Sequence, residues 1–282
     1  MLYYFIIRRK YKQEDTFKNF ISKCRYKINE RKNEILYSGL GMKKVQKLLK
    51  GHHYICFLDF EGTQFSHEMI AIGACLATLD RKGNIKRLKE NFKIYVRAKN
   101  RIGNYVTNLT GITEEKLQKE GVSFYKAMSE LRNYCGSAFK KCSFITFGNH
   151  DYRILNQSIS YNLDTPKEIV SIIQHNYVDF SALISEFIRD DNNNPYSLLN
   201  YCKLFNVTEE GEAHDPASDA LNLAHLYNAF LNNEEIVLRE YLKLLSKPHH
   251  LPLPIAEAAT KLANGEDFTA EEFKALAKKV IE

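Results

Sequence analysis

The sequence lacks the features that mark disulfide-rich, membrane-spanning and repetitive proteins. It has no Cys-x-x-Cys pair, no apolar run near the roughly 20 residues that cross a bilayer, and no internal repeat. Its six cysteines lie far apart and mostly in apolar stretches: Cys24, Cys56, Cys75, Cys135, Cys142 and Cys202. This spacing predicts reduced core residues of a cytoplasmic protein and not a disulfide framework. We therefore expect a soluble protein that folds around a hydrophobic core.

Positive charge is concentrated at the beginning of the chain and outweighed by negative charge elsewhere. Residues 1–50 carry 14 Lys and Arg against 4 Asp and Glu, a local charge of +10, whereas the rest carries 26 against 30. A basic arm of this kind attracts a polyphosphate partner, because each neutralised phosphate releases bound counterions. The same composition also fits a solvated amphipathic helix, so charge alone leaves both interpretations open.

Hydrophobic periodicity divides the chain into three regions. We expect a basic, mainly helical N-terminal extension at residues 1–50, a central domain at 51–232 and a helical C-terminal tail at 233–282. In the central domain, strand patterns at 54–60, 69–79 and 92–97 precede alternating helices and strands. This order predicts an α/β fold whose mixed sheet begins with three antiparallel strands and is flanked by helices.

Capping residues predict where several helices begin. Thr113 fits the N-cap of a short helix, and Thr165 to Glu168 has the pattern of a capping box with proline at the first helical position. A second capping box is expected at Thr269 to Glu272. Between the last helices, the Pro-interrupted stretch from His249 to Pro254 is expected to form a hinge.

The first candidate site residues are Asp59 and Glu61, at the end of an apolar strand. Residues two apart on a strand point to the same face, so these carboxylates should project side by side. Two adjacent carboxylates repel each other and are costly to bury unless a cation compensates them, which favours a divalent metal site. A strand that simply ends in solvent would have the same pattern, so the pair is weak evidence when taken alone.

The second candidate group is His214 and Asp219, which flank the start of an expected helix. Asp215 followed by Pro216 fits an N-cap and a first helical residue, which leaves His214 in the preceding loop. Asp219 shares its helix face with apolar residues at intervals of four, three and four: Leu223, Leu226 and Phe230. A simple preference of an acid for the positive helix end does not explain this apolar company. For His214, an inconsequential loop histidine is the alternative.

Asp151 is the third candidate, at the junction between an apolar strand and a helix. An acid in the first turn of a helix is favoured by the helix dipole whatever its role. Its position at the carboxyl end of a strand is nevertheless where open α/β sheets place their sites. The neighbouring His150 fits a surface or supporting residue better than a second catalytic histidine.

Together, the four carboxylates and one histidine meet a specific chemical demand. Two divalent ions about 3.5 to 4 Å apart can activate a water, orient a phosphodiester and stabilise the leaving oxygen. Hard oxygen ligands suit Mg²⁺ or Mn²⁺. A histidine whose pKa is near neutrality can accept the proton that the attacking water must lose.

These residues, in this order, resemble the three motifs of the DEDDh family of 3′–5′ exonucleases. The motifs are Asp59-Phe60-Glu61-Gly62-Thr63, then Asp151, then His214 with Asp219 five residues later. Leu109-Thr110-Gly111-Ile112-Thr113 and Ser197-Leu198-Leu199 are also similar to family sequence. The resemblance covers roughly residues 52–232, and among family members it is strongest to the exonucleases that trim histone messenger and small interfering RNAs.

The resemblance implies a ribonuclease-H-like fold and a metal-dependent phosphodiester hydrolase that removes nucleoside 5′-monophosphates from 3′ ends of RNA or single-stranded DNA. It implies that two Mg²⁺ or Mn²⁺ ions are held by Asp59, Glu61, Asp151 and Asp219, with His214 as general base. By the same analogy, the terminal nucleotide would be held around Phe60, Gly62, Thr63, Leu109, Thr110 and Gly111.

Pro216 departs from the family pattern, which usually has alanine two residues after the histidine. Proline there should stiffen the loop that carries His214, so the rate could fall even with every ligand intact. The alternative function is a catalytically weak nucleic-acid-binding module on the same fold, in which the basic arm binds the nucleic acid and the sheet is only a scaffold. The presence of all five catalytic residue types favours the enzyme.

Overall fold

The computed structural model describes residues 44–45, 47–212, 214–246 and 252–281. The chain divides into two units, Met1–Lys47 and Leu48–Glu282. Nearly all of the first unit lies outside the described residues, so the expected N-terminal extension at 1–50 stays a prediction. The second unit contains the whole central domain and the C-terminal tail.

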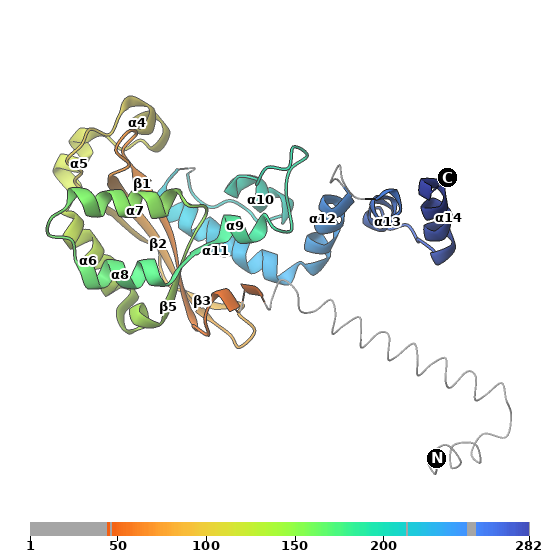
Figure 1. Ribbon diagram of the computed structural model, residues 1–282. Coiled ribbons are helices and arrows are strands. Elements are labelled where there is room, and N and C mark those ends of the chain that lie inside the picture. The colour runs from red at the N-terminus through yellow and green to blue at the C-terminus, as the bar shows by residue number, and fades with distance from the viewer. Residues whose placement is uncertain (1–43, 46, 213, 247–251, 282) are drawn as a thin grey trace, which may run out of the picture. The chain divides into compact units, whose positions relative to one another are not determined.

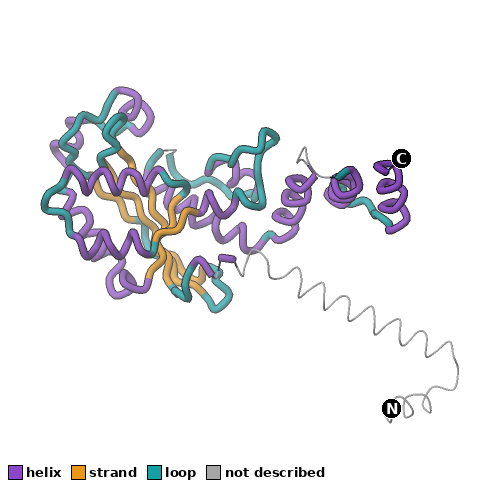
Figure 2. The backbone as a smooth tube through the Cα atoms, viewed as in Figure 1, coloured by secondary structure: helices purple, strands orange, loops and turns teal. Residues whose placement is uncertain are grey.

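A mixed sheet forms the centre of the second unit, with helices on both of its faces (Figures 1 and 2). Its strands are β1 (Tyr54–Gly62), β2 (Met69–Leu79), β3 (Ile85–Leu88), β4 (Phe92–Tyr95), β5 (Cys142–Thr146) and β6 (Tyr177–Asp179). The order is β3-β2-β1-β5-β6, and β4 also pairs with β2. Strands β1 to β4 pair antiparallel, whereas β1, β5 and β6 run parallel. The expected α/β fold with a mixed sheet is thus confirmed.

Helices follow the strands in the expected alternation. Those of the central region are α4 (Asn104–Thr110), α5 (Glu114–Glu120), α6 (Phe124–Cys135), α7 (His150–Tyr161), α8 (Lys167–His175), α9 (Phe180–Ile184), α10 (Leu198–Leu204) and α11 (Pro216–Asn232). A short 3₁₀ helix (Gly136–Lys141) extends α6. The Thr113 hydroxyl accepts a hydrogen bond from the Lys116 amide, which confirms Thr113 as the cap of α5.

The two faces of the sheet differ in what they bury. On one face, alternate residues of β1 and β2 pack against α6, α7 and α8 in a continuous apolar core that includes Leu58, Phe60, Ile72, Leu131 and Ile154. On the other face, α11 covers the sheet, and Phe57 lies edge-on to Tyr227 at 5.4 Å between ring centroids. Side chains alternate between faces along a strand, so this second face also carries Asp59 and Glu61.

Two expectations about local structure were wrong. The antiparallel part of the sheet has four strands, β1 to β4, where three were expected; β3 shows no apolar pattern, because its residues are exposed or half-buried and include Lys86 and Arg87. The capping box at Thr165 to Glu168 does not form: α8 begins at Lys167, after a Pro166 that makes no side-chain cap bond. Thr165 instead donates its hydroxyl hydrogen to the Asn162 carbonyl at 2.6 Å, which closes the preceding turn.

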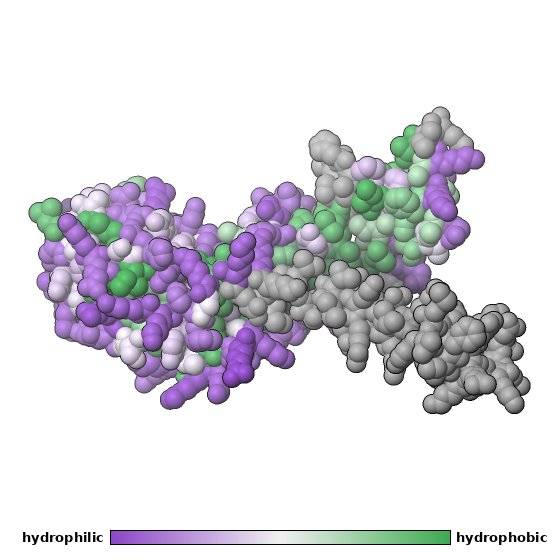
Figure 3. All heavy atoms as spheres, turned by 60° about the horizontal axis from the view of Figure 1, so that its bottom comes forward, coloured by the Kyte–Doolittle hydropathy of each residue, from purple (hydrophilic) through white to green (hydrophobic). Residues whose placement is uncertain are grey.

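The C-terminal tail is helical where it is described. It comprises α12 (Glu234–Ser246), α13 (Leu253–Ala263) and α14 (Ala270–Ile281). The capping box at Thr269 is confirmed, because the Thr269 hydroxyl accepts from the Glu272 amide and the Glu272 carboxylate accepts from the Thr269 amide. The expected hinge falls partly on residues 247–251, outside the described residues. Exposed apolar side chains gather on these helices (Figure 3), among them Leu253, Leu262 and Phe273. Across the described ranges, no helix is long and apolar enough to span a membrane.

Candidate active site

Asp59 and Glu61 stand at the carboxyl end of the central strand β1. In the antiparallel register, Asp59 pairs with Gly73 of β2, and Gly73 pairs with Lys93 of β4. Asp59, Gly73 and Lys93 thus form a row across three strands, with Glu61 in the next row on the same face. The register shifts between Glu61 and Gly62, where the strand leaves regular pairing. The two carboxylates therefore project together, as the sequence predicted.

Asp151 reaches the same end of β1 from the first turn of α7. Strands β1 and β5 run parallel, so the loop that follows β5 returns beside the carboxyl end of β1. The Asp151 side chain is 5% exposed, and its Oδ1 accepts a hydrogen bond from the Phe60 amide at 2.7 Å. That bond joins α7 to the backbone residue between Asp59 and Glu61.

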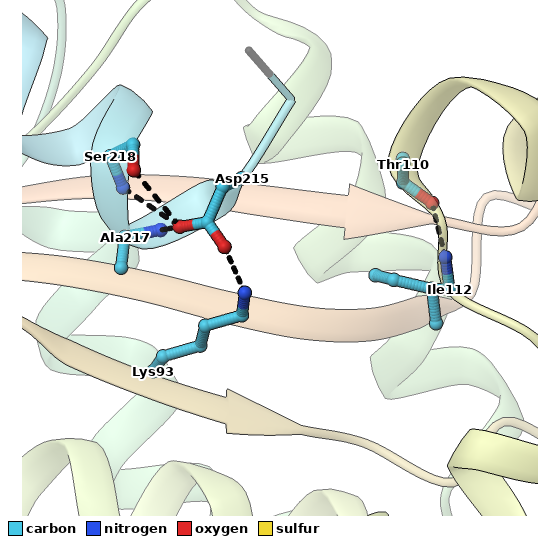
Figure 4. Close-up of polar contacts among 6 residues, drawn as sticks. All are labelled: Lys93, Thr110, Ile112, Asp215, Ala217 and Ser218. Atoms are coloured by element: carbon cyan, nitrogen blue, oxygen red, sulfur yellow. Dashed lines mark hydrogen bonds and ion pairs between the residues drawn. The ribbon is translucent and has the colours of Figure 1, made fainter. Parts of the chain in front are cut away.

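The start of α11 brings His214 and Asp219 to the site. Asp215 caps the helix: its Oδ1 accepts hydrogen bonds from the amides of Ala217 at 3.1 Å and Ser218 at 3.0 Å (Figure 4). Asp219 follows in the first turn and is half-buried, while His214 precedes the cap and is exposed. His214 has a φ of 62°, in the left-handed region that a non-glycine residue adopts only at some cost.

Gly73 allows this helix start to lie directly on the sheet. A Cβ atom on Gly73 would collide with the Pro216 carbonyl group and the Ala217 nitrogen. Only glycine lets the backbone of α11 approach β2 so closely. The absence of one side chain thus places the first turn of α11 beside Asp59, the strand neighbour of Gly73.

The four carboxylates form one electrostatic cluster. Burial, and then repulsion from Asp151, Glu61 and Asp219, raise the pKa of Asp59 well above its ordinary value. Burial, and then repulsion from Asp151 and Asp219, raise the pKa of Glu61 to about 8. Burial raises the pKa of Asp151 to about 7, although the hydrogen bond from Phe60 opposes this rise. Burial also raises the pKa of Asp219, against which nearby His214 acts. The structure therefore brings all five predicted residues together.

The chemistry of this donor set fits divalent metal ions. Buried carboxylates that repel one another are stabilised by a cation, and oxygen donors are what Mg²⁺ and Mn²⁺ prefer. Within the described residues, no group of three His, Cys, Asp or Glu side chains is already drawn together in a coordination arrangement. The carboxylates are thus near enough to raise one another's pKa values but do not form a closed coordination cage.

The six residues expected to hold a nucleotide fall into two groups. Around β1, the Phe60 side chain lies in the core, Gly62 packs against Ile154, and the Thr63 hydroxyl bonds Ser66 and the Glu68 amide. All three of these residues are buried. At the end of α4, Leu109 is exposed and the helix ends at Gly111 in the left-handed region. Thr110 closes that turn by accepting from the Ile112 amide (Figure 4).

A surface cleft of about 1000 Å³ lies between the loop after β1 and helices α4 and α5. Two exposed aromatic side chains line it: Phe65 is 81% exposed and Tyr105 is 65% exposed. Arg101 and Gln118 are also on its wall. The residues that line the cleft are close in sequence to both groups of expected nucleotide contacts. The first of them directly follows Thr63, and others precede Leu109.

Two residues of the site were not predicted from the sequence. Lys93 makes an ion pair with Asp215, the cap of α11 (Figure 4). Asp179 accepts a hydrogen bond from the Gly148 amide at 3.1 Å and thereby holds the loop that leads into Asp151. Asp179 is also the N-cap of α9, and an Asp between a short strand and a helix was a usable signal for that cap. Lys93 offered no local signal.

Comparison with known families assigns the chain to a class of nucleases. The model of the RNase T group, described as Exonuclease, matches residues 56–227. This match spans more than half of the chain and includes all five site residues. The chain therefore belongs to the exonuclease family, and its central domain is a nuclease domain.

Solved structures show the same fold. The nuclease domain of 3′hExo, a DEDDh family member bound to rAMP, is 19% identical with a TM-score of 0.50, over 64% of this chain and 93% of that one. A 3′-exonuclease in a structure of histone mRNA stem-loop recognition is 20% identical with a TM-score of 0.51, covering 68% and 70%. Cell-death related nuclease 4 is 18% identical with a TM-score of 0.51, covering 64% and 64%. Among curated protein sequences, no significant match is found.

Proposed function

We propose that this protein is a 3′–5′ exonuclease that hydrolyses RNA or single-stranded DNA and releases nucleoside 5′-monophosphates. The observation that carries the proposal is the convergence of Asp59, Glu61, Asp151 and Asp219 at one end of β1, with His214 beside Asp219. The family match supports nuclease chemistry, and the DEDDh resemblance supports the 3′ direction.

The four carboxylates would hold two Mg²⁺ or Mn²⁺ ions, whose chemistry is to neutralise the phosphodiester charge and make water more acidic. Asp151 is held in place for this task by the Phe60 amide, and Asp219 by its position in the first turn of α11. Two of the ligands thus come from the central strand β1, and the other two come from helices α7 and α11. Ligands on such rigid elements favour a fixed geometry.

His214 would act as the general base. Its exposed side chain can accept a proton from the attacking water and pass that proton to solvent. Pro216 does not prevent this role, because it is the first residue of α11 and leaves the backbone of His214 outside the helix. The proline thereby fixes the point where the loop ends and the helix begins.

The cleft beside α4 supports a single-stranded substrate. Exposed aromatic rings such as Phe65 and Tyr105 can stack on unpaired bases, and the guanidinium of Arg101 can bind a phosphate. Bases in a duplex are already stacked on one another and offer no free faces. We therefore expect faster digestion of single strands than of matched duplexes.

Matched oligonucleotides test the proposal. RNA and DNA of the same sequence, single-stranded or duplex and labelled at the 5′ end, would be digested with Mg²⁺ or Mn²⁺. We expect a ladder that shortens one nucleotide at a time, and a strand blocked by a 3′-phosphate should resist digestion, which marks the direction. A catalytically weak binding module would retard the same strands in a gel and leave them at full length. That outcome would replace the enzyme with the alternative function.

A further inference from the structure

The ion pair between Lys93 and Asp215 ties the start of α11 to the edge of the sheet. The two carboxylate oxygens of Asp215 have separate partners (Figure 4). Oδ1 accepts from the amides of Ala217 and Ser218 and from the Ser218 hydroxyl at 3.2 Å, whereas Oδ2 accepts from Lys93 Nζ. One side chain therefore both caps the helix and connects it to β4.

Lys93 is placed for this contact by the strand register. It stands in the same row as Asp59 and Gly73, so its side chain rises from the face on which α11 begins. Gly73 lets the Pro216 carbonyl group lie on the sheet between Asp59 and Lys93. Lys93 is only partly exposed, at 32% of its side chain, and its ammonium also lies 5.3 Å from the centre of the Tyr95 ring. The ammonium is thus restrained from two sides.

His214 directly precedes this anchor, and its backbone amide also donates a hydrogen bond to the Asp219 carboxylate. It is exposed, and its backbone is in the left-handed region at a φ of 62°. The next residue along the chain is Asp215, whose amide donates to the Glu212 carbonyl at 3.2 Å and closes the turn. If Asp215 moved, the turn and the His214 backbone would move with it.

We propose that Lys93 is a positioning residue for the general base: its ion pair with Asp215 fixes the loop that carries His214. This inference rests on the proposed function. Lys93 also lowers the pKa of Glu61 through its charge, although burial and the neighbouring acids dominate that pKa. Combined variants distinguish the two routes. If Lys93 acts through His214, its replacement causes no further loss once His214 is gone. If it acts through Glu61 or the substrate, the two losses multiply.

The first test replaces the ammonium while keeping the length of the side chain. Lys93→Met should lower kcat by roughly 10-fold to 100-fold with little change in KM, since small displacements of a reacting group have effects of this size. Lys93→Arg keeps a cation and should recover at least part of the loss. Lys140→Met removes an exposed ion pair with Glu168 elsewhere in the fold and should leave kcat unchanged. A rise in KM at constant kcat in Lys93→Met would instead indicate substrate binding and overturn the proposal.

Combining variants shows whether Lys93 acts through the histidine. In a His214→Ala background, adding Lys93→Met should cause no further loss, because there is no imidazole left to position. Losses that multiply would overturn the proposal. Asp215→Asn can still cap the helix and loses the ion pair, so it should resemble Lys93→Met. The double variant Lys93→Met with Asp215→Asn should be no worse than either single variant.

Hydrogen–deuterium exchange separates this inference from the proposed function, because it requires no activity. In Lys93→Met, the amides of Ala217, Ser218 and Asp219 should exchange at least several-fold faster than in wild type, and in Lys140→Met they should not. Unchanged exchange in Lys93→Met would refute the anchor even if the enzyme is active. An inactive wild-type protein that shows faster exchange in Lys93→Met would refute the proposed function and keep the anchor.

Discussion

The two faces of the central sheet serve different purposes, although the same strands supply both. Leu58 and Phe60 point to α6, α7 and α8 and lie in an apolar core, whereas Asp59 and Glu61 point to the face where α11 begins. Adjacent residues of β1 thus pack into the core on one face and contribute carboxylates on the other. Strand alternation alone therefore allows an acidic site to lie on one face of a sheet and an apolar core on the other.

The two faces also contribute to stability with opposite signs. Burial of apolar side chains is favourable, at roughly 25 cal/mol for each Å² removed from water. Burial of carboxylates that repel one another is unfavourable until a cation compensates them. The apolar face therefore offsets the cost of holding Asp59, Glu61 and Asp151 in place without metal. Substitutions on the two faces should separate activity from stability.

The largest expected effect is on the acidic face. Asp59→Asn should lower the rate of mononucleotide release by about 10³-fold or more, because it removes a charge from a set of groups that act together. The variant should melt at the same or a higher temperature than wild type without metal, since the pKa of Asp59 is raised by burial and by its acidic neighbours. Activity assays and thermal melts check both parts. Lost activity accompanied by a lower melting temperature would indicate unfolding in place of lost catalysis.

A substitution on the apolar face should show the opposite pattern. Leu131 of α6 is fully buried in the core, so Leu131→Ala should lower the free energy of unfolding by about 2 to 5 kcal/mol. The rate constant for each folded molecule should stay within about 2-fold of wild type, because the cavity lies across the sheet from the carboxylates. Urea denaturation and active-site titration measure the two quantities. A large fall in kcat at unchanged KM would show that the faces are coupled.

Metal ions and protons should compete on the acidic face. The pKa of Glu61 is raised to about 8 and that of Asp151 to about 7, above unfolded values of about 4. The folded protein without metal therefore binds protons more tightly than the unfolded chain, and its stability falls as pH rises from about 4 to 8. Added Mg²⁺ should raise the melting temperature on the order of a few degrees at pH 8 and less at pH 5. An equal rise at both pH values, or the same rise in Asp59→Asn, would contradict this.

The smallest effect is expected from charge that belongs to neither face. Neutralising Lys and Arg residues within 1–47 should weaken substrate binding and flatten its salt dependence, with kcat unchanged. Removing one cation that binds a phosphate should reduce the salt slope by about 0.7 on a single strand. Fluorescence anisotropy at several salt concentrations measures the slope, with Asp59→Asn as the background to prevent digestion. An unchanged slope would remove the basic arm from the binding surface.

Short-range patterns explain which parts of this structure the sequence could predict. The alternation of β1 places Asp59 and Glu61 on one face, and the pair Asp215 and Pro216 marks the start of α11. Both patterns depend only on neighbouring residues. Asp151 and His214, in their order along the chain, completed the family resemblance. That resemblance in turn predicted the site.

Contacts between distant segments could not be predicted in the same way. Lys93 and Asp215 are 122 residues apart, and their pairing depends on the β2 and β4 register and on the closeness of α11 to Gly73. The β3 strand has no buried apolar face, so its sequence shows no strand pattern. The Thr165 side chain could form either of two local hydrogen bonds. It bonds the Asn162 carbonyl and closes a turn, and it does not form the capping box.

The proposed mechanism requires four carboxylates from three segments of the chain to share divalent ions at the end of β1. Crystals soaked in Mn²⁺ and measured at a wavelength where manganese scatters anomalously test it directly. We expect anomalous peaks from manganese beside the carboxylate oxygens of Asp59, Glu61, Asp151 and Asp219, lost or weakened in Asp59→Asn. Peaks only elsewhere on the protein, or none at millimolar Mn²⁺, would show that these four carboxylates hold no metal ions.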